Sequence, residues 1–123
     1  MMTEESPDVV SPDVVSPSRR SNILLTVKLA LADQIAETGF AYVGPNAERS
    51  YNLNRVRFNN IVRFLREDGY APHYLELEKP DTEVSEMILV KVLAPAGTTQ
   101  QKVWANRDLI LKMWADAQPQ TRN

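Results

Sequence analysis

Hydrophobic residues follow two different periods along this chain, and the switches between them predict its elements. Apolar positions recur every three to four residues over 23–37, 53–68 and 99–117, which is typical of amphipathic helices. They alternate with polar positions over 73–79 and form an almost continuous apolar run over 86–93, which indicates two strands. The order predicts an α+β domain: helix, short irregular region, helix, β-hairpin, helix.

The segment between the first two helices is rich in turn residues. Gly44, Pro45 and Asn46 lie at its centre, and such residues mark turns. The sequence before them is compatible with a short strand over Phe40–Val43. The sequence after them is compatible with a short helix beginning at Pro45.

Capping residues predict the ends of the three longer helices. Ser, Thr and Asn side chains accept a hydrogen bond from the free N–H groups of a first turn, and Gly adopts the left-handed conformation that often ends a helix. A Thr followed by Gln three residues later forms a capping box. The residues in these places are Asn22 or Ser21 before the first helix, Gly39 after it, Gly69 after the second, and Thr98 with Gln101 before the third.

The first and last helices are both strongly apolar. In the first, the polar residues Thr26, Asp33 and Glu37 share one narrow side, so we expect burial against more than one element, a second copy of the chain being one alternative. Its length and its Lys28 argue against a membrane span. In the last, we expect Trp104, Ile110 and Trp114 to anchor either the core or a homodimer. The apolar stripe of that helix comprises Val103, Ile110, Trp114 and Ala117, with Leu111 and Met113 beside it.

The N-terminal segment has a different composition. Residues 6–15 are the tandem repeat SPDVV SPDVV, and prolines at five-residue spacing oppose both helix and sheet. We expect residues 1–20 to form a disordered acidic tail, residues 21–118 to form one globular domain, and residues 119–123 to fray. The segment lacks the basic and apolar regions of a signal peptide, so a cytoplasmic protein is expected. The tail is either simply solvated or a phosphorylation or partner motif.

Composition excludes several kinds of site. The chain has no Cys and one His, which rules out disulfides, Cys-based zinc sites and multi-histidine metal sites. His73 would need a nucleophile or carboxylate beside it to act as a general base, and the sequence indicates none. Asp81, Glu83 and Glu86 do not have the spacing of an EF-hand. We therefore expect no enzymatic activity and no cofactor.

Charge is distributed unevenly along the chain. The net charge is −2, yet residues 1–18 hold four acids and no base. The hairpin region 76–86 holds five acids and one base. In contrast, residues 49–66 hold five Arg and no acid. The acidic average therefore conceals one basic helix.

The second helix has two chemically distinct faces. Four of its polar residues fall within about an 80° arc, at the spacing that a helix in the major groove of DNA presents. Arg neutralises phosphates and pairs with guanine, and Asn pairs with adenine. An ordinary solvated face and a site for an acidic protein remain alternatives. The residues of the apolar face are Leu53, Phe58, Ile61, Phe64 and Leu65. The residues expected to contact DNA are Arg49, Asn54, Arg55, Arg57, Asn59, Asn60, Arg63 and Arg66.

From Asn22 to about Ala94 the order of elements resembles the winged helix-turn-helix superfamily. NRVRFNNIVRFLREDGY stands in the place of the recognition helix, and HYLELEK with EMILVKVL stands in the place of the wing. The resemblance implies a fold of three main helices, a two-stranded hairpin and a C-terminal helix, and a DNA-binding regulator or architectural protein with helix 54–66 in the major groove. The alternative is a protein–protein assembly module without a nucleic-acid ligand.

Overall fold

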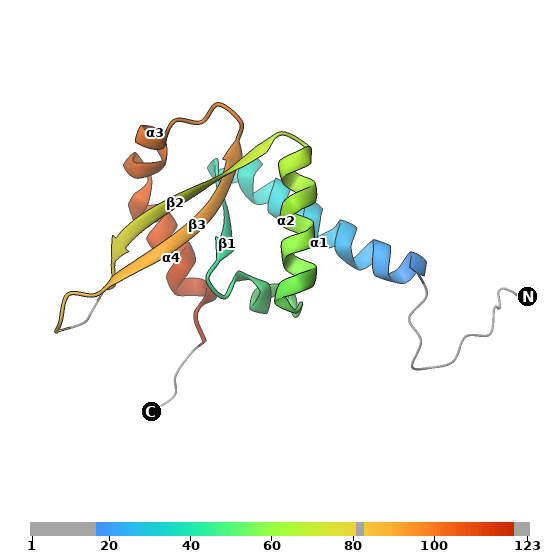
Figure 1. The fold of residues 1–123 in the computed structure, drawn as a ribbon, viewed down its shortest axis with the longest axis horizontal. Helices are drawn as coiled ribbons and strands as arrows, with labels where there is room; N and C mark the ends of the chain where they lie inside the picture. The colour runs from blue at the N-terminus through green and yellow to red at the C-terminus, as the bar shows by residue number, and fades with distance from the viewer. Residues whose placement is uncertain (1–16, 81–82, 120–123) are drawn as a thin grey trace, which may run out of the picture.

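The computed structural model describes residues 17–80 and 83–119, with side chains from Asn22 onward. The predicted α+β class is confirmed (Figure 1). The SPDVV repeat, Asp81 and residues 120–123 lie outside the described residues. The elements are α1 (Pro17–Thr38), β1 (Ala41–Gly44), the 3-10 helix η1 (Ala47–Tyr51), α2 (Arg55–Glu67), β2 (Tyr70–Glu78), β3 (Met87–Pro95), α3 (Gln100–Ala105) and α4 (Arg107–Ala117).

The three strands form one antiparallel sheet in the order β1-β3-β2. The predicted hairpin is present, with Leu75 opposite Val90 and Glu78 opposite Met87. The short β1 pairs with the other edge of β3, where Ala41 lies opposite Leu93. β3 is therefore the central strand, which explains why its sequence is more uniformly apolar than that of β2.

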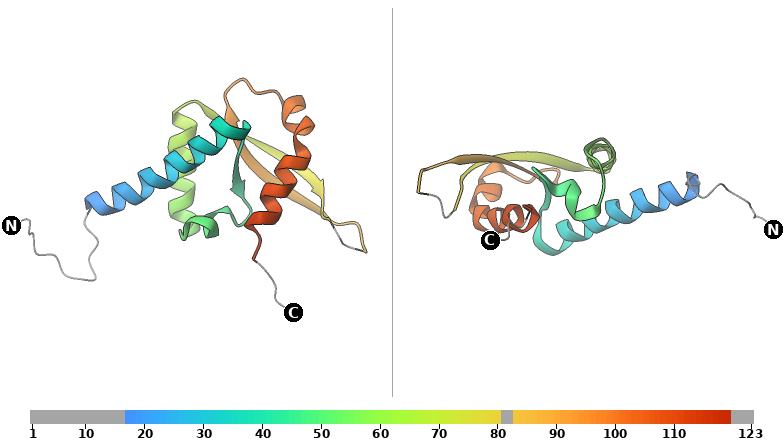
Figure 2. Two further views of the ribbon diagram at one scale, coloured as in Figure 1. Left: turned by 180° about the vertical axis from the view of Figure 1, so that it is seen from behind. Right: turned by 90° about the horizontal axis from the view of Figure 1, so that it is seen from below.

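The helices pack around the sheet from both sides, and α1 also packs directly on α2. α4 lies under one face beside the inner part of α1, and α2 lies on the other side near the end of the hairpin closest to the body (Figure 2). Alternate strand residues, such as Leu75, Leu77 and Val90, are buried. Beyond α2 the opposite face is open, so that Tyr74 and Leu89 are more than half exposed.

α1 begins earlier than its sequence predicts. Pro17 is its first residue, so residues 17–20 are helical and neither Ser21 nor Asn22 is its cap. Pro is tolerated in a first turn because its missing N–H has no partner there. The predicted end is confirmed, since Gly39 has φ +94° and its N–H donates to the Ile35 carbonyl at 2.7 Å.

The last helix is broken where the sequence predicts one continuous helix. α3 ends at Ala105. The side chain of its C-cap, Asn106, donates to the Lys102 carbonyl at 2.9 Å and competes with the helical backbone. The predicted capping box at Thr98 is also wrong. Thr99 caps α3, because its hydroxyl accepts a hydrogen bond from the Lys102 N–H at 3.1 Å.

The predicted dimer anchors fall into two groups. Ile110 is fully buried and Trp114 is 8% exposed, and both belong to the core of a single chain. Of the two alternatives for these residues, core or dimer, the structure shows the core. Trp104 is 48% exposed and remains accessible.

The apolar arc of α1 is only partly covered. Val27, Leu31 and Ile35 pack into the core, but Leu25 and Leu29 are 50% and 54% exposed. The N-terminal half of the helix extends past the rest of the domain (Figure 2). Within one chain, the side of α1 that carries Val27, Leu31 and Ile35 is buried as expected, whereas the side that carries Leu25 and Leu29 is not.

Candidate nucleic-acid interface

Helix α2 is fixed firmly to the domain by one face and by its ends. Phe58, Ile61 and Leu65 are almost fully buried in the core. The Asn54 Oδ1 accepts a hydrogen bond from the Arg57 N–H at 2.8 Å, which caps the first turn. Gly69, at φ +108°, follows the last turn as predicted. The outer face of α2 is therefore held in a defined position.

The outer face presents one row of polar side chains, which we name the basic ridge: Arg55, Asn59, Arg63 and Arg66. All four are exposed. Helical geometry places them within about 80° of one another and spreads them over roughly 16 Å. Across residues 17–80 and 83–119, no ion pair or side-chain hydrogen bond engages them. Their donors are thus available to a ligand.

The other four predicted DNA contacts lie away from the ridge. Arg49 is exposed on η1, and Arg57 is exposed on nearly the opposite side of α2. Asn60 is only partly exposed. Asn54 uses its side-chain oxygen as the helix cap. The structure thus brings together half of the predicted set.

Two residues of α2 are not placed as the predicted apolar face requires. Phe64 is 40% exposed, and its ring lies 5.4 Å from the Arg63 guanidinium carbon. Val62, which the sequence prediction omits, is 4% exposed and belongs to the core. The core-facing side is therefore rotated slightly from the one that helical periodicity suggests.

A shallow hollow of about 240 Å³ lies beside the N-terminal end of the ridge. Arg55 and Asn59 line it from α2, and Tyr74, Leu89 and Lys91 line it from the sheet. The Lys91 ammonium is 5.8 Å from the centre of the Tyr74 ring, a cation–π distance. Glu48 is also part of the lining.

Sequence reasoning missed Lys91 and Tyr74 as members of this surface. Both lie on the open face of the hairpin, opposite one another in the strand register. The available signal was a single Lys in an otherwise apolar strand, EMILVKVL. Whether this Lys lies on the surface depends on which face of the sheet the helices cover. That follows only from the packing of α2 and α4.

One acidic side chain at the end of α2 is already neutralised. The Lys28 ammonium lies 2.7 Å from the Asp68 carboxylate, which joins α1 to the C-cap of α2. Both side chains are partly exposed, so the pair contributes little to stability. It does reduce the negative charge beside Arg66.

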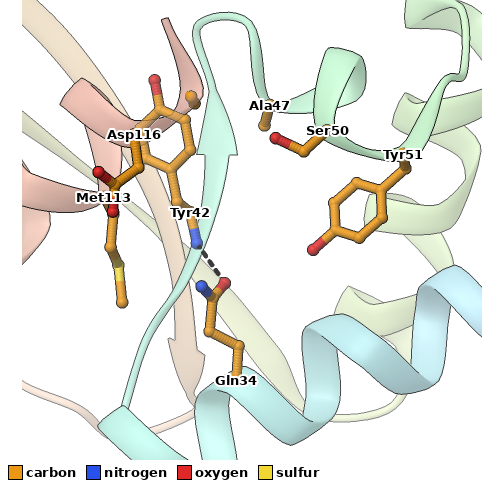
Figure 3. A pocket seen from close by; sticks show the side chains of 8 residues that line it. Gln34, Tyr42, Ala47, Ser50, Tyr51, Met113 and Asp116 are labelled. Carbon is orange, nitrogen blue, oxygen red and sulfur yellow. Dashed lines mark hydrogen bonds between the residues drawn. The ribbon is translucent and has the colours of Figure 1, made fainter.

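A second hollow, between α1, η1 and α4, is too small for most organic ligands. Its volume is about 130 Å³, whereas ligand pockets usually measure about 300–1,000 Å³. Gln34 accepts a hydrogen bond from the Tyr42 N–H at 3.1 Å (Figure 3). Burial raises the pKa of Tyr42 and of Tyr51 above the ordinary value of a phenol. We interpret this hollow as part of the packing.

His73 takes part in a contact between β2 and α3. Its Nδ1 lies 3.0 Å from the Gln100 Oε1, and Gln100 in turn donates to the Tyr74 carbonyl at 3.2 Å. These contacts tie the start of α3 to β2. Among the described residues no group of three His, Asp or Glu side chains is placed to hold a metal ion.

Comparisons with known proteins identify no relative. No protein-family model, curated protein or solved structure matches the chain. In the described part of the chain, no helix has both the length and the apolar character needed to cross a membrane.

Proposed function

We propose that this protein is a small DNA-binding regulator or architectural protein of winged-helix type, in which α2 enters the major groove. The observation that carries the proposal is the basic ridge, with its exposed Arg and Asn side chains on a rigid helix. No chemical step is involved, and binding alone is the activity.

The ridge suits both parts of DNA recognition. Arg55, Arg63 and Arg66 can neutralise phosphates, whose contacts supply most of the affinity. Asn59 and the flat guanidinium groups can form paired hydrogen bonds with base edges, which supply sequence preference. The spread of roughly 16 Å along α2 equals about half a turn of the duplex.

The order of elements supports the same proposal. α1, the short η1 and α2 precede the hairpin of β2 and β3, as the resemblance to winged helices requires. The hairpin differs from a phosphate-binding wing because Glu76 and Glu78 on it are exposed. In our proposal the hairpin points away from the phosphates, and Arg55 with Lys91 forms the boundary of the interface.

Salt-dependent binding of the Arg55→Ala/Arg63→Ala variant tests the proposal. We expect the wild type to lose affinity for duplex DNA steeply between 50 and 200 mM salt, roughly in proportion to the phosphates contacted. The double variant should reduce the slope of log affinity against log salt by about 2. Fluorescence anisotropy with random-sequence duplexes measures both quantities.

Lys112→Ala is the matched control, since Lys112 is an exposed cation on α4. Its affinity should equal that of the wild type. A wild type that binds no duplex DNA, or a double variant that binds as well as the control, would contradict the proposal.

The second candidate function is an assembly module, and the exposed stripe of α1 favours it. Leu25 and Leu29 lie about one turn apart on a side of α1 that one chain leaves uncovered. A second copy of α1 is the simplest cover for a stripe of this length. Sedimentation equilibrium of the wild type and of Leu25→Glu/Leu29→Glu tests it: only the wild type should dimerise.

A further inference from the structure

The outer edge of β2 is a free edge of the sheet. β2 is the last strand in the order β1-β3-β2. The Lys79 N–H donates inward to the Glu86 carbonyl at 2.7 Å, and inward and outward groups alternate along an antiparallel strand. The backbone groups of Glu76 and Glu78 therefore point outward. The Tyr74 carbonyl has the same direction, since Gln100 on α3 reaches it from outside the sheet.

The sequence of β2 agrees with this direction. Pro72 stands in the same outward series, and Pro is confined to strand positions whose N–H would face away from the ladder. No partner outside the ladder contacts the Glu76 or Glu78 backbone anywhere in residues 17–80 and 83–119. These groups are available for strand addition.

A groove follows this free edge between the hairpin and the last two helices, and we name it the β2 groove. Its volume is about 490 Å³. The apolar side chains of Leu77, Met87, Trp104 and Leu111 contribute to its lining. Trp104 is 48% and Met87 59% exposed, so a ligand would find apolar surface there that the chain itself leaves uncovered.

The rim of the β2 groove is acidic. Glu76, Glu78 and Asp108 line it against the single cation Arg107, whose guanidinium carbon lies 4.8 Å from the Trp104 ring centre. The Glu78 carboxylate accepts a hydrogen bond from the Ser85 hydroxyl at 2.8 Å, which fixes its position. The rim therefore favours a cationic ligand.

Charge also excludes two occupants from within this protein. Residues 1–16 carry four acids and no base, so this segment would be repelled. A second copy that paired β2 with β2 would place the glutamates of both copies side by side, which destabilises a strand pair. The complementary partner is a basic segment of another protein.

We propose that the β2 groove binds an extended basic peptide segment as an additional strand on β2. The peptide backbone pairs with the outward groups of Glu76 and Glu78, its cations face the acidic rim, and its apolar residues pack on Trp104. Main-chain bonds supply affinity and alternate side chains supply specificity, as in other strand-addition complexes. The site is separate from the basic ridge and does not depend on DNA binding.

A capped heptapeptide that alternates Lys with Val and Leu is the probe, and its glutamate analogue is the control. Titration of the full chain, followed by NMR, should shift the amides of Glu76 and Glu78 and the Trp104 indole. Hydrogen exchange at both amides should slow when the lysine peptide binds. Absence of saturable shifts, shifts confined to α2, or equal binding of the glutamate peptide would overturn the proposal.

Two variants separate strand addition from simple charge attraction. Glu78→Pro removes the outward N–H, whereas Glu78→Gln removes only the charge and is its matched control. We expect Glu78→Pro to weaken binding roughly five- to tenfold beyond Glu78→Gln, the effect of one lost hydrogen bond. Equal affinities of the two variants would contradict strand addition.

Trp104→Ala keeps the proposal testable if Glu78→Pro perturbs the hairpin. The half-exposed Trp104 can be truncated with little effect on the core. We expect roughly tenfold weaker binding, typical of an aromatic anchor. Unchanged affinity for the lysine peptide would count against the β2 groove as the site.

Discussion

The basic ridge and the β2 groove lie on one small domain but expose different chemistry. α2 satisfies its own backbone hydrogen bonds, so the ridge can act only through its side chains. β2 is an edge strand, so the groove also offers backbone donors and acceptors. The ridge is cationic and the groove rim is anionic. The two surfaces thus carry opposite charge, which the net charge of −2 does not reveal.

The two surfaces also differ in how their charges are arranged. Residues 49–66, which include most of α2, hold five Arg and no acid. On β2 the exposed glutamates protect a free edge that would otherwise pair with other chains.

The largest expected effect is on the free energy of unfolding, and it distinguishes the buried face of α2 from its exposed face. Phe58→Ala should lower the free energy of unfolding by about 3–5 kcal/mol, because the ring is 1% exposed and its removal leaves a cavity. Val56→Ala, at a position 71% exposed, should change it by less than about 0.5 kcal/mol. Urea denaturation measures both, and similar losses would mean that α2 is not packed as described.

Charge reversal on the ridge should act on binding without acting on stability. Arg55→Glu/Arg63→Glu should weaken duplex DNA binding by roughly a hundredfold at 50 mM salt, because two favourable phosphate contacts become repulsive. The urea midpoint should remain close to that of the wild type, since neither side chain forms an ion pair or a side-chain hydrogen bond among the described residues. A large fall in the midpoint would assign these residues a structural role.

Two asparagines of α2 should behave differently although both were predicted to contact DNA. Asn54→Ala should destabilise the fold by about 1 kcal/mol through loss of the helix cap. Asn59→Ala should leave stability within about 0.5 kcal/mol and weaken DNA binding. Thermal unfolding and anisotropy on the two variants measure these effects. Equal stability losses would contradict the division between cap and ridge.

The smallest expected effect concerns the influence of the hairpin on DNA. Glu76→Lys/Glu78→Lys should raise duplex DNA affinity by roughly twofold at low salt, through long-range attraction alone. The gain should disappear near 150 mM salt, where charges beyond about 8 Å are screened. A gain that persists at higher salt would place the hairpin in direct contact with phosphates.

The sequence alone predicted those elements whose structure depends on a local pattern of residues. The amphipathic period predicted α2 and its ridge, and Gly39 predicted the end of α1, because each depends on neighbouring residues alone. The sequence did not predict the break at Asn106, because an Asn can either continue a helix or cap one. Tertiary packing decides between these two roles. Trp114 could not be assigned to core or dimer from periodicity, because both uses require the same apolar stripe.

Gln100 imposes a limit on any ligand of the β2 groove. Its Nε2 donates a hydrogen bond to the Tyr74 carbonyl while the Oε1 of the same amide contacts the His73 Nδ1, so the edge is closed there. Only the stretch from Glu76 to Glu78 remains for an incoming backbone, with the hairpin turn at its far end. In our proposal the partner segment therefore pairs with β2 over a short stretch and makes few main-chain hydrogen bonds.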